Sequence, residues 1–162
     1  LALIRSMEAT MTTLEPTFDE NHCIKACNSL LRGELSAIET YRQAIEKFNG
    51  EKGIVQLRTI EAEHKRSAFE LREHILAMGG APEVDSGALG TLTHAIQSTA
   101  NFFGEESAVV FLTRGEEIGK TAYENALQDE GMMQPVREII QERLLPRTTQ
   151  HIATLEALTD EL

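Results

Sequence analysis

The 162-residue sequence contains no tryptophan, only 5% aromatic residues, four prolines and two cysteines. A chain of this length buries enough surface to fold as one domain without disulfides, so the few cysteines exclude a disulfide scaffold without excluding a stable core. Apolar runs near the roughly 20 residues of a membrane span are also missing. We therefore expect a single domain that does not cross a membrane, and a cytoplasmic location.

Positive charge is the second scarce property. Lys and Arg number 15 against 26 Asp and Glu, which gives a formal net charge of −11. Nucleic-acid binding that is independent of sequence needs a basic surface, because cationic side chains must displace the counterions of the phosphates. Acidic membranes repel such a chain as well. The composition therefore predicts neither nucleic-acid nor membrane partners.

Good helix formers make up much of what is present, and glycine and proline gather in short stretches such as residues 79–82. Between these stretches, apolar residues recur at steps of three and four, which indicates amphipathic helices. The pattern predicts four helices, at about residues 19–48, 52–78, 105–129 and 135–162. Residues 79–104 then form a long connection with a short helix near 89–103, and residues 1–18 a flexible N-terminal segment before the domain at 19–162.

Each predicted helix has polar residues within its apolar stripe: Glu34 in the first, Glu61 and His64 in the second, Glu116 in the third, and Thr148 and His151 in the fourth. A buried carboxylate without a partner costs several kcal/mol, so these residues need compensation or an escape to solvent. Antiparallel neighbours bring the interruptions to similar heights, because each helical residue rises 1.5 Å. Pairing with arginines at the surface is one solution, and a metal ion shared at mid-bundle is the more economical one.

An internal repeat relates the first and third predicted helices. Arg-Gly-Glu followed by tyrosine seven positions after the glutamate occurs twice, first at residues 32–34 with Tyr41 and again at residues 114–116 with Tyr123. The period is too long for a solenoid and fits a duplicated helix hairpin. The repeat therefore predicts that two hairpins pack their equivalent faces together.

These features resemble the ferritin-like superfamily, an all-α fold that is an up-down four-helix bundle with a long crossover between its second and third helices. The resemblance implies that Glu34 and Glu116 are terminal metal ligands, that Glu61 is a bridge, and that His64 and His151 are nitrogen ligands. It places Tyr41 and Tyr123 next to the ions. Three stretches, DSGALGTLTHA, LTRGEEIGKTAYENAL and LLPRTTQHIATLEAL, are more narrowly similar to a bacterial ferritin-like group known only as a domain of unknown function.

Thr148 departs from the superfamily pattern, because a bridging glutamate is expected at that position. Three glutamates balance two divalent ions poorly, so a second ion binds more weakly or the site holds a single one. The resemblance implies a divalent metal, with iron the first expectation and zinc an alternative. The implied function is Fe(II) oxidation or metal handling in stress, with enzymatic activity left open. The competing hypothesis is a metal-free bundle that serves as a structural or interaction module. We expect a homodimer in either case.

Two local features leave alternatives open. Cys23 and Cys27, beside His22, are either small buried apolar residues or part of a thiolate metal site. Pro146 lies within the fourth predicted helix and removes one backbone donor. It predicts either a kink or a short break there, or the end of one helix near Leu145 and the start of another.

Overall fold

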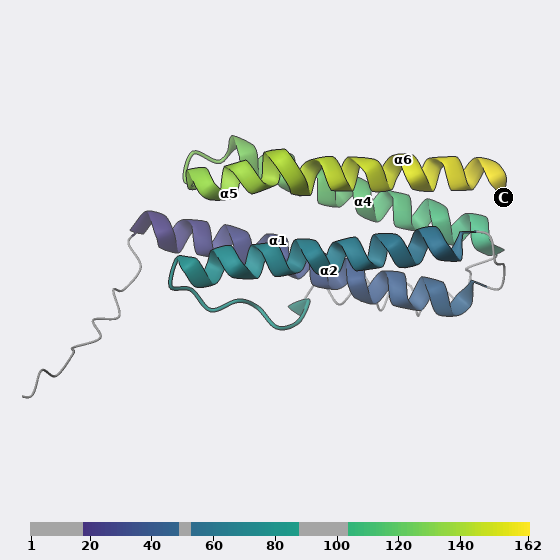
Figure 1. Ribbon diagram of the computed structural model, residues 1–162, viewed down its shortest axis with the longest axis horizontal. Helices are drawn as coiled ribbons and strands as arrows, with labels where there is room; N and C mark the ends of the chain where they lie inside the picture. Colours follow the sequence, from purple (N-terminus) through teal and green to yellow (C-terminus); the bar gives the residue numbers. More distant parts are fainter. Residues whose placement is uncertain (1–17, 49–52, 88–103) are drawn as a thin grey trace, which may run out of the picture.

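The computed structural model describes residues 18–48, 53–87 and 104–162, and all statements below concern these ranges (Figure 1). The predicted N-terminal segment and the predicted short helix near 89–103 lie outside them, apart from Phe18. The helices are α1 (Phe18–Lys47), α2 (Ile54–Ala77), α4 (Gly104–Gln128), α5 (Gln134–Ile139), the π-helical turn η2 (Ile140–Leu144) and α6 (Leu145–Glu161). Because α5, η2 and α6 follow one another without a gap, they form the fourth long rod.

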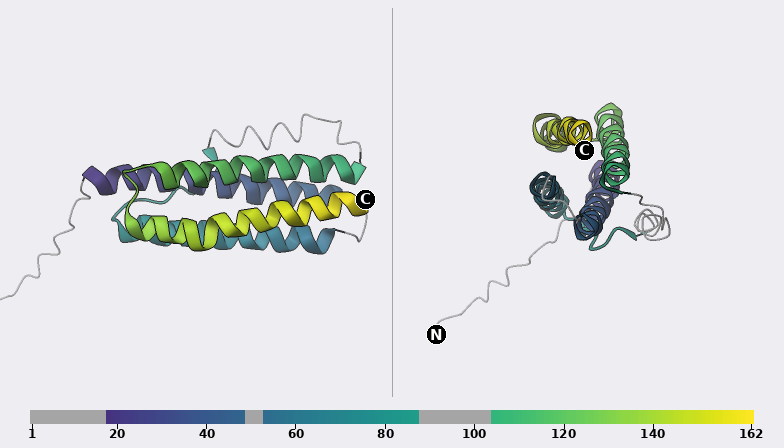
Figure 2. Two further views of the ribbon diagram at one scale, coloured as in Figure 1. Left: turned by 90° about the horizontal axis from the view of Figure 1, so that it is seen from above. Right: turned by 90° about the vertical axis from the view of Figure 1, so that its right-hand side faces the viewer.

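The four rods lie at the corners of a bundle, as the end-on view of Figure 2 shows. The hairpin of α1 and α2 packs beside the hairpin of α4 and α6, and neighbouring helices run in opposite directions (Figures 1 and 2). The all-α four-helix prediction is therefore confirmed. No helix in the described ranges combines the length and the apolar character needed to cross a membrane.

The connection after α2 turns back along α1. Gly79 adopts a φ of 76°, and the N–H of Gly80 donates to the carbonyl of Ile75, which is the glycine-based helix end that the sequence predicts. The chain then bonds to α1 at two successive points: the amide of Asn28 donates to the Ala81 carbonyl at 3.0 Å, and Arg32 contacts Glu83 at 2.9 Å. Residues 81–83 therefore lie alongside α1.

Pro146 is accommodated inside a continuous rod. The backbone N–H of Leu145 donates to the carbonyl of Ile140, five residues earlier, so the helix widens to a π-helical turn just before the proline. A wider turn fits a residue that has no N–H and whose ring crowds the preceding turn. Where the sequence left open a kink, a break or a new helix, the structure has a π-helical turn, and α6 continues beyond it past His151.

Two apolar clusters fill the bundle. The larger includes Cys23, Cys27, Leu71, Ile75, Ile140 and Leu144, and the smaller includes Phe48, Leu57, Val109, Leu155 and Leu158. Both cysteines are fully buried and unbridged, as the apolar alternative predicts. The two cysteines therefore belong to the packed core.

Candidate metal centre

Each of the four rods contributes one buried ionisable side chain at mid-height: Glu34 from α1, His64 from α2, Glu116 from α4 and His151 from α6. All four are at most 6% exposed. His64 lies between the two glutamates, with Nδ1 2.6 Å from Glu34 Oε2 and Nε2 2.8 Å from Glu116 Oε1. His151 Nδ1 lies 3.2 Å from Glu116 Oε2. The structure therefore brings these four predicted residues together.

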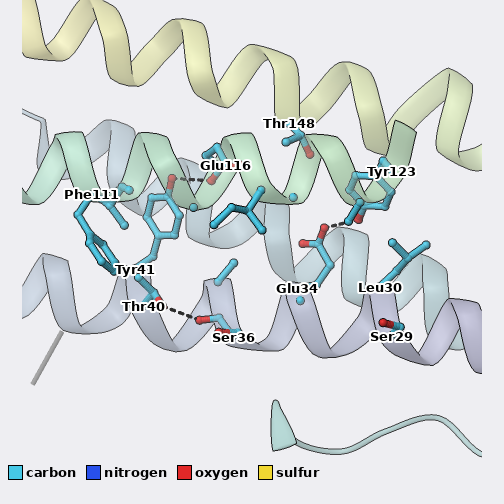
Figure 3. A pocket seen from close by; sticks show the side chains of 17 residues that line it. Ser29, Leu30, Glu34, Ser36, Thr40, Tyr41, Phe111, Glu116, Tyr123 and Thr148 are labelled. Carbon is cyan, nitrogen blue, oxygen red and sulfur yellow. Dashed lines mark hydrogen bonds between the residues drawn. The ribbon is translucent and has the colours of Figure 1, made fainter. Parts of the chain in front are cut away.

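The two tyrosines connect the repeated motifs. The hydroxyl of Tyr41 donates to Glu116 Oε1 at 2.6 Å, and the hydroxyl of Tyr123 donates to Glu34 Oε1 (Figure 3). Seven residues separate glutamate from tyrosine in both motifs, and α1 and α4 are antiparallel. Each tyrosine is therefore level with the glutamate of the other helix. Tyr41 and Tyr123 thus hold the carboxylates from the two halves of the bundle.

His64 offsets part of the negative charge in this layer. Burial by itself lowers the pKa of His64, but the carboxylates of Glu34 and Glu116 face its ring nitrogens and raise that pKa to about 10. For Glu116, burial raises the pKa, and His64 and His151 outweigh it and lower the pKa to about 2. An imidazolium between two carboxylates therefore compensates part of the buried negative charge, for which the sequence suggested arginine or a metal ion.

We expect the metal-free protein to lose stability as the pH rises above 6.5. The native state holds the His64 proton more tightly than the unfolded chain, whose imidazole titrates near 6.5, so this contribution is complete below pH 6.5 and is lost as the pH passes about 10. Glu116 sets the acid limit, because its contribution is complete above pH 4.5 and is lost as the pH falls through about 2.

Urea unfolding with a chelator present measures this pH dependence. The free energy of unfolding should be about 3 kcal/mol lower near pH 9.5 than near pH 6, at about 1.36 kcal/mol for each pH unit of linked titration. His64→Gln should remove most of the difference. An equal decline in that variant would assign the effect to other groups.

The donor set fits a divalent metal ion. His64, Glu116 and His151 each offer a ligand atom, and these atoms lie within 4.8 Å of one another. The nitrogens that face Glu116 are Nε2 of His64 and Nδ1 of His151. Their other nitrogens contact the carboxylates of Glu34 and Glu63, and a carboxylate behind each imidazole is the usual way to orient a metal-binding histidine.

Glu61 lies apart from this group, although the resemblance implies a bridging role for it. Its Oε1 contacts Arg42 Nε at 3.1 Å and Lys65 Nζ at 2.6 Å. Burial raises the pKa of Glu61, but the hydrogen bonds from Lys65 and Arg42 outweigh it and lower the pKa. Glu61 therefore serves an ion-pair network beside α1 in this structure.

Glu63 takes the position next to the histidines instead. Its Oε2 lies 2.7 Å from His151 Nε2. On α2 it belongs to a polar row with Ser67 and Glu70, which both contact Arg147 of α6. The spacing of four and three residues indicates that this row shares one face of α2. The sequence alone did not show that this face packs against α6.

Thr148 is buried on the inner face of α6, one turn before His151, and is 4% exposed. Its hydroxyl donates to the Leu144 carbonyl at 3.1 Å. Figure 3 shows Thr148 across from Glu34 and near Tyr123. Thr148 therefore faces the bundle interior, and a threonine there adds no carboxylate to the layer.

Comparison with known proteins agrees with this architecture. Residues 22–129 match the family model described as "Domain of unknown function (DUF2383)", which spans α1, α2 and α4. The chain belongs to this family. The DUF2383 match includes Glu34, His64 and Glu116, whereas His151 lies beyond it. No curated protein matches the chain.

A solved structure extends the comparison to the whole bundle. It is described as a crystal structure of ferritin like, diiron-carboxylate proteins from Bacillus anthracis str. Ames, and it aligns with a TM-score of 0.67. The alignment covers 88% of this chain and 99% of that one at 18% identity. This DUF2383 chain therefore has a ferritin-like fold, as predicted.

Proposed function

We propose that this protein binds a divalent transition-metal ion, with Fe(II) the leading candidate, at the centre formed by His64, Glu116 and His151. The observation that supports this most strongly is the convergence of two imidazoles and a carboxylate from three helices, with a further carboxylate behind each imidazole. Two histidines and one carboxylate with open positions are typical of non-haem Fe(II) sites. The ferritin-like neighbour, described as a diiron-carboxylate protein, is consistent with iron.

The residues have two roles in metal binding: some ligate the ion and others orient the ligands. Glu116 supplies the carboxylate between the two histidines, and Glu34 and Glu63 orient His64 and His151. Bound iron would supply redox chemistry with oxygen or peroxide, which is the enzymatic part of the proposal. With Thr148 in place of a fourth acid, the donor set favours one strongly bound ion over two.

The alternative is a metal-free bundle that acts as a structural or interaction module. One observation favours it: protonated His64 already offsets one of the two charges of Glu34 and Glu116, and the ring nitrogens and carboxylates of this layer have hydrogen-bond partners. An ion must therefore displace a proton and several hydrogen bonds. Metal uptake separates the two functions directly.

Elemental analysis of protein purified without chelators, followed by anaerobic Fe(II) and Zn(II) titration, tests the proposal. We expect about one equivalent of metal per chain, and release of about one proton on binding because ligating imidazoles are neutral. Less than about 0.1 equivalent as purified, with no uptake on titration, would leave the metal-free module as the function. If Fe(II) binds but oxidises in air at the rate of free Fe(II), the redox part is wrong.

Two neighbouring glutamates on α2 test the ligand assignment. Glu63→Gln should weaken metal binding by about 10- to 100-fold, because His151 loses the carboxylate that orients it. Glu61→Gln should change the affinity by less than about threefold, because Glu61 is engaged with Arg42 and Lys65. Calorimetric titration with Zn(II) measures both. The reverse ranking would restore Glu61 as the bridging ligand that the resemblance implies.

A further inference from the structure

A cavity of about 310 Å³ lies between α1 and α4 and reaches the inner carboxylates of Glu34 and Glu116 (Figure 3). Its walls are mainly apolar, with Leu30 on one side and Phe111 and Ile118 on the other. A cavity of this size accommodates a small organic molecule, and ligand pockets commonly combine apolar walls with a few polar groups. The polar row of α2 and α6, with Glu63, lies on another side of the bundle.

Glycines keep this cavity open. Gly33 and Gly115 directly precede the two glutamates in the repeated motif, and a Cβ atom added at either would meet no atom of the described residues within 4 Å. The same is true of Gly119, one turn further along α4. Glycine inside a helix costs about 1 kcal/mol relative to alanine, and close packing does not explain it where a side chain would have room. The missing side chains therefore leave space beside both carboxylates.

The lining defines the charge of a suitable ligand. The described residues around the cavity include no lysine or arginine, so no cationic side chain among them compensates a bound anion. The two carboxylates already accept hydrogen bonds from Tyr41, Tyr123 and the histidines, so an organic cation would have to replace these bonds as well as leave water. A neutral molecule that is mostly apolar loses least on leaving water for this site.

We propose that the cavity between α1 and α4 binds a small, uncharged, mainly apolar organic molecule directly beside the Glu34 and Glu116 carboxylates. This inference goes beyond metal binding and does not require a bound ion. In a metal-loaded protein, the same molecule would lie against the ligand Glu116. A neutral, mainly apolar molecule would then be the co-ligand or substrate of the metal centre. The donor atoms of the centre alone do not indicate this class of molecule.

Tyrosine fluorescence reports on this cavity specifically. The sequence has two tyrosines and no tryptophan, and both tyrosines line the cavity. Three probes of equal ring size that differ in charge are titrated into chelator-treated protein: cyclohexanol, cyclohexanecarboxylate and cyclohexylammonium. We expect a saturable change in emission for cyclohexanol, with a Kd on the order of 1 mM, and at least about tenfold weaker binding of both charged probes. Calorimetry confirms the stoichiometry.

Gly115→Leu fills the cavity and should weaken cyclohexanol binding by more than about tenfold while the circular dichroism stays helical. Ala153→Leu, at an exposed position on α6, is the matched control and should bind like the wild type. Gly119→Leu replaces the first variant if that one fails to fold. Absence of saturable binding, equal binding of a charged probe, or unchanged binding in a folded cavity-filling variant would overturn the inference. None of these outcomes depends on metal uptake.

Discussion

Metal uptake is expected to disappear when Glu116 is replaced with alanine, and the metal-free protein should become less stable by roughly 3–5 kcal/mol. Glu116 is 4% exposed and accepts hydrogen bonds from Tyr41, His64 and His151. Its removal leaves a protonated His64 facing one carboxylate instead of two, and a buried tyrosine hydroxyl without its acceptor. Zn(II) calorimetry and urea unfolding in chelator measure the two effects separately.

Glu117→Ala is the matched control, because Glu117 is the adjacent carboxylate on α4 and is exposed. It should change the stability by less than about 0.5 kcal/mol and leave the metal affinity unaltered. Glu116→Gln separates charge from shape, since the amide still accepts hydrogen bonds but no longer balances the imidazolium. If Glu116→Ala binds Zn(II) like the wild type, the centre does not lie where we propose it.

Helix positions and the polar layer were predictable because both follow from periodicity. The apolar steps of three and four located the four rods, and the interruptions at Glu34, His64, Glu116 and His151 identified side chains that now share one level. The repeat was equally informative, because equal spacing of glutamate and tyrosine on antiparallel helices produces the reciprocal bonds of Tyr41 and Tyr123. These predictions needed only local geometry.

The rotation of α2 about its axis was not predictable in this way. Glu61 and His64 are three residues apart and share a face in an ideal helix, yet Arg42 and Lys65 draw the Glu61 carboxylate away. Glu63 directly precedes His64 in the sequence and therefore points to a different side of α2. It reaches His151 because α6 lies on that side of α2. Such contacts depend on which helix neighbours which face. The charge of His64 was missed for the same reason, since it arises from two carboxylates on two other helices. The homodimer and the cytoplasmic location stay predictions.

Thr148→Glu should raise the number of metal ions bound from about one to about two per chain, as measured by anaerobic Co(II) titration. Thr148 occupies the inner face of α6 one turn from His151, so a glutamate there would add a carboxylate beside Glu34 and Glu116, and the added negative charge would favour a second divalent ion. Without metal, a further buried acid beside Glu34 and Glu116 has no free partner. The variant should therefore be less stable than the wild type by several kcal/mol in chelator.

Added metal should recover this loss, because ligand binding to the native state stabilises it by mass action. Thr149→Glu adds the same charge at the neighbouring exposed position, so it should alter neither the stoichiometry nor the metal-free stability by a comparable amount. Co(II) stoichiometry that stays at about one in Thr148→Glu, with stability that metal does not restore, would show that the missing acid does not limit the site. The geometry of α6 beyond Pro146 would then be the limiting factor.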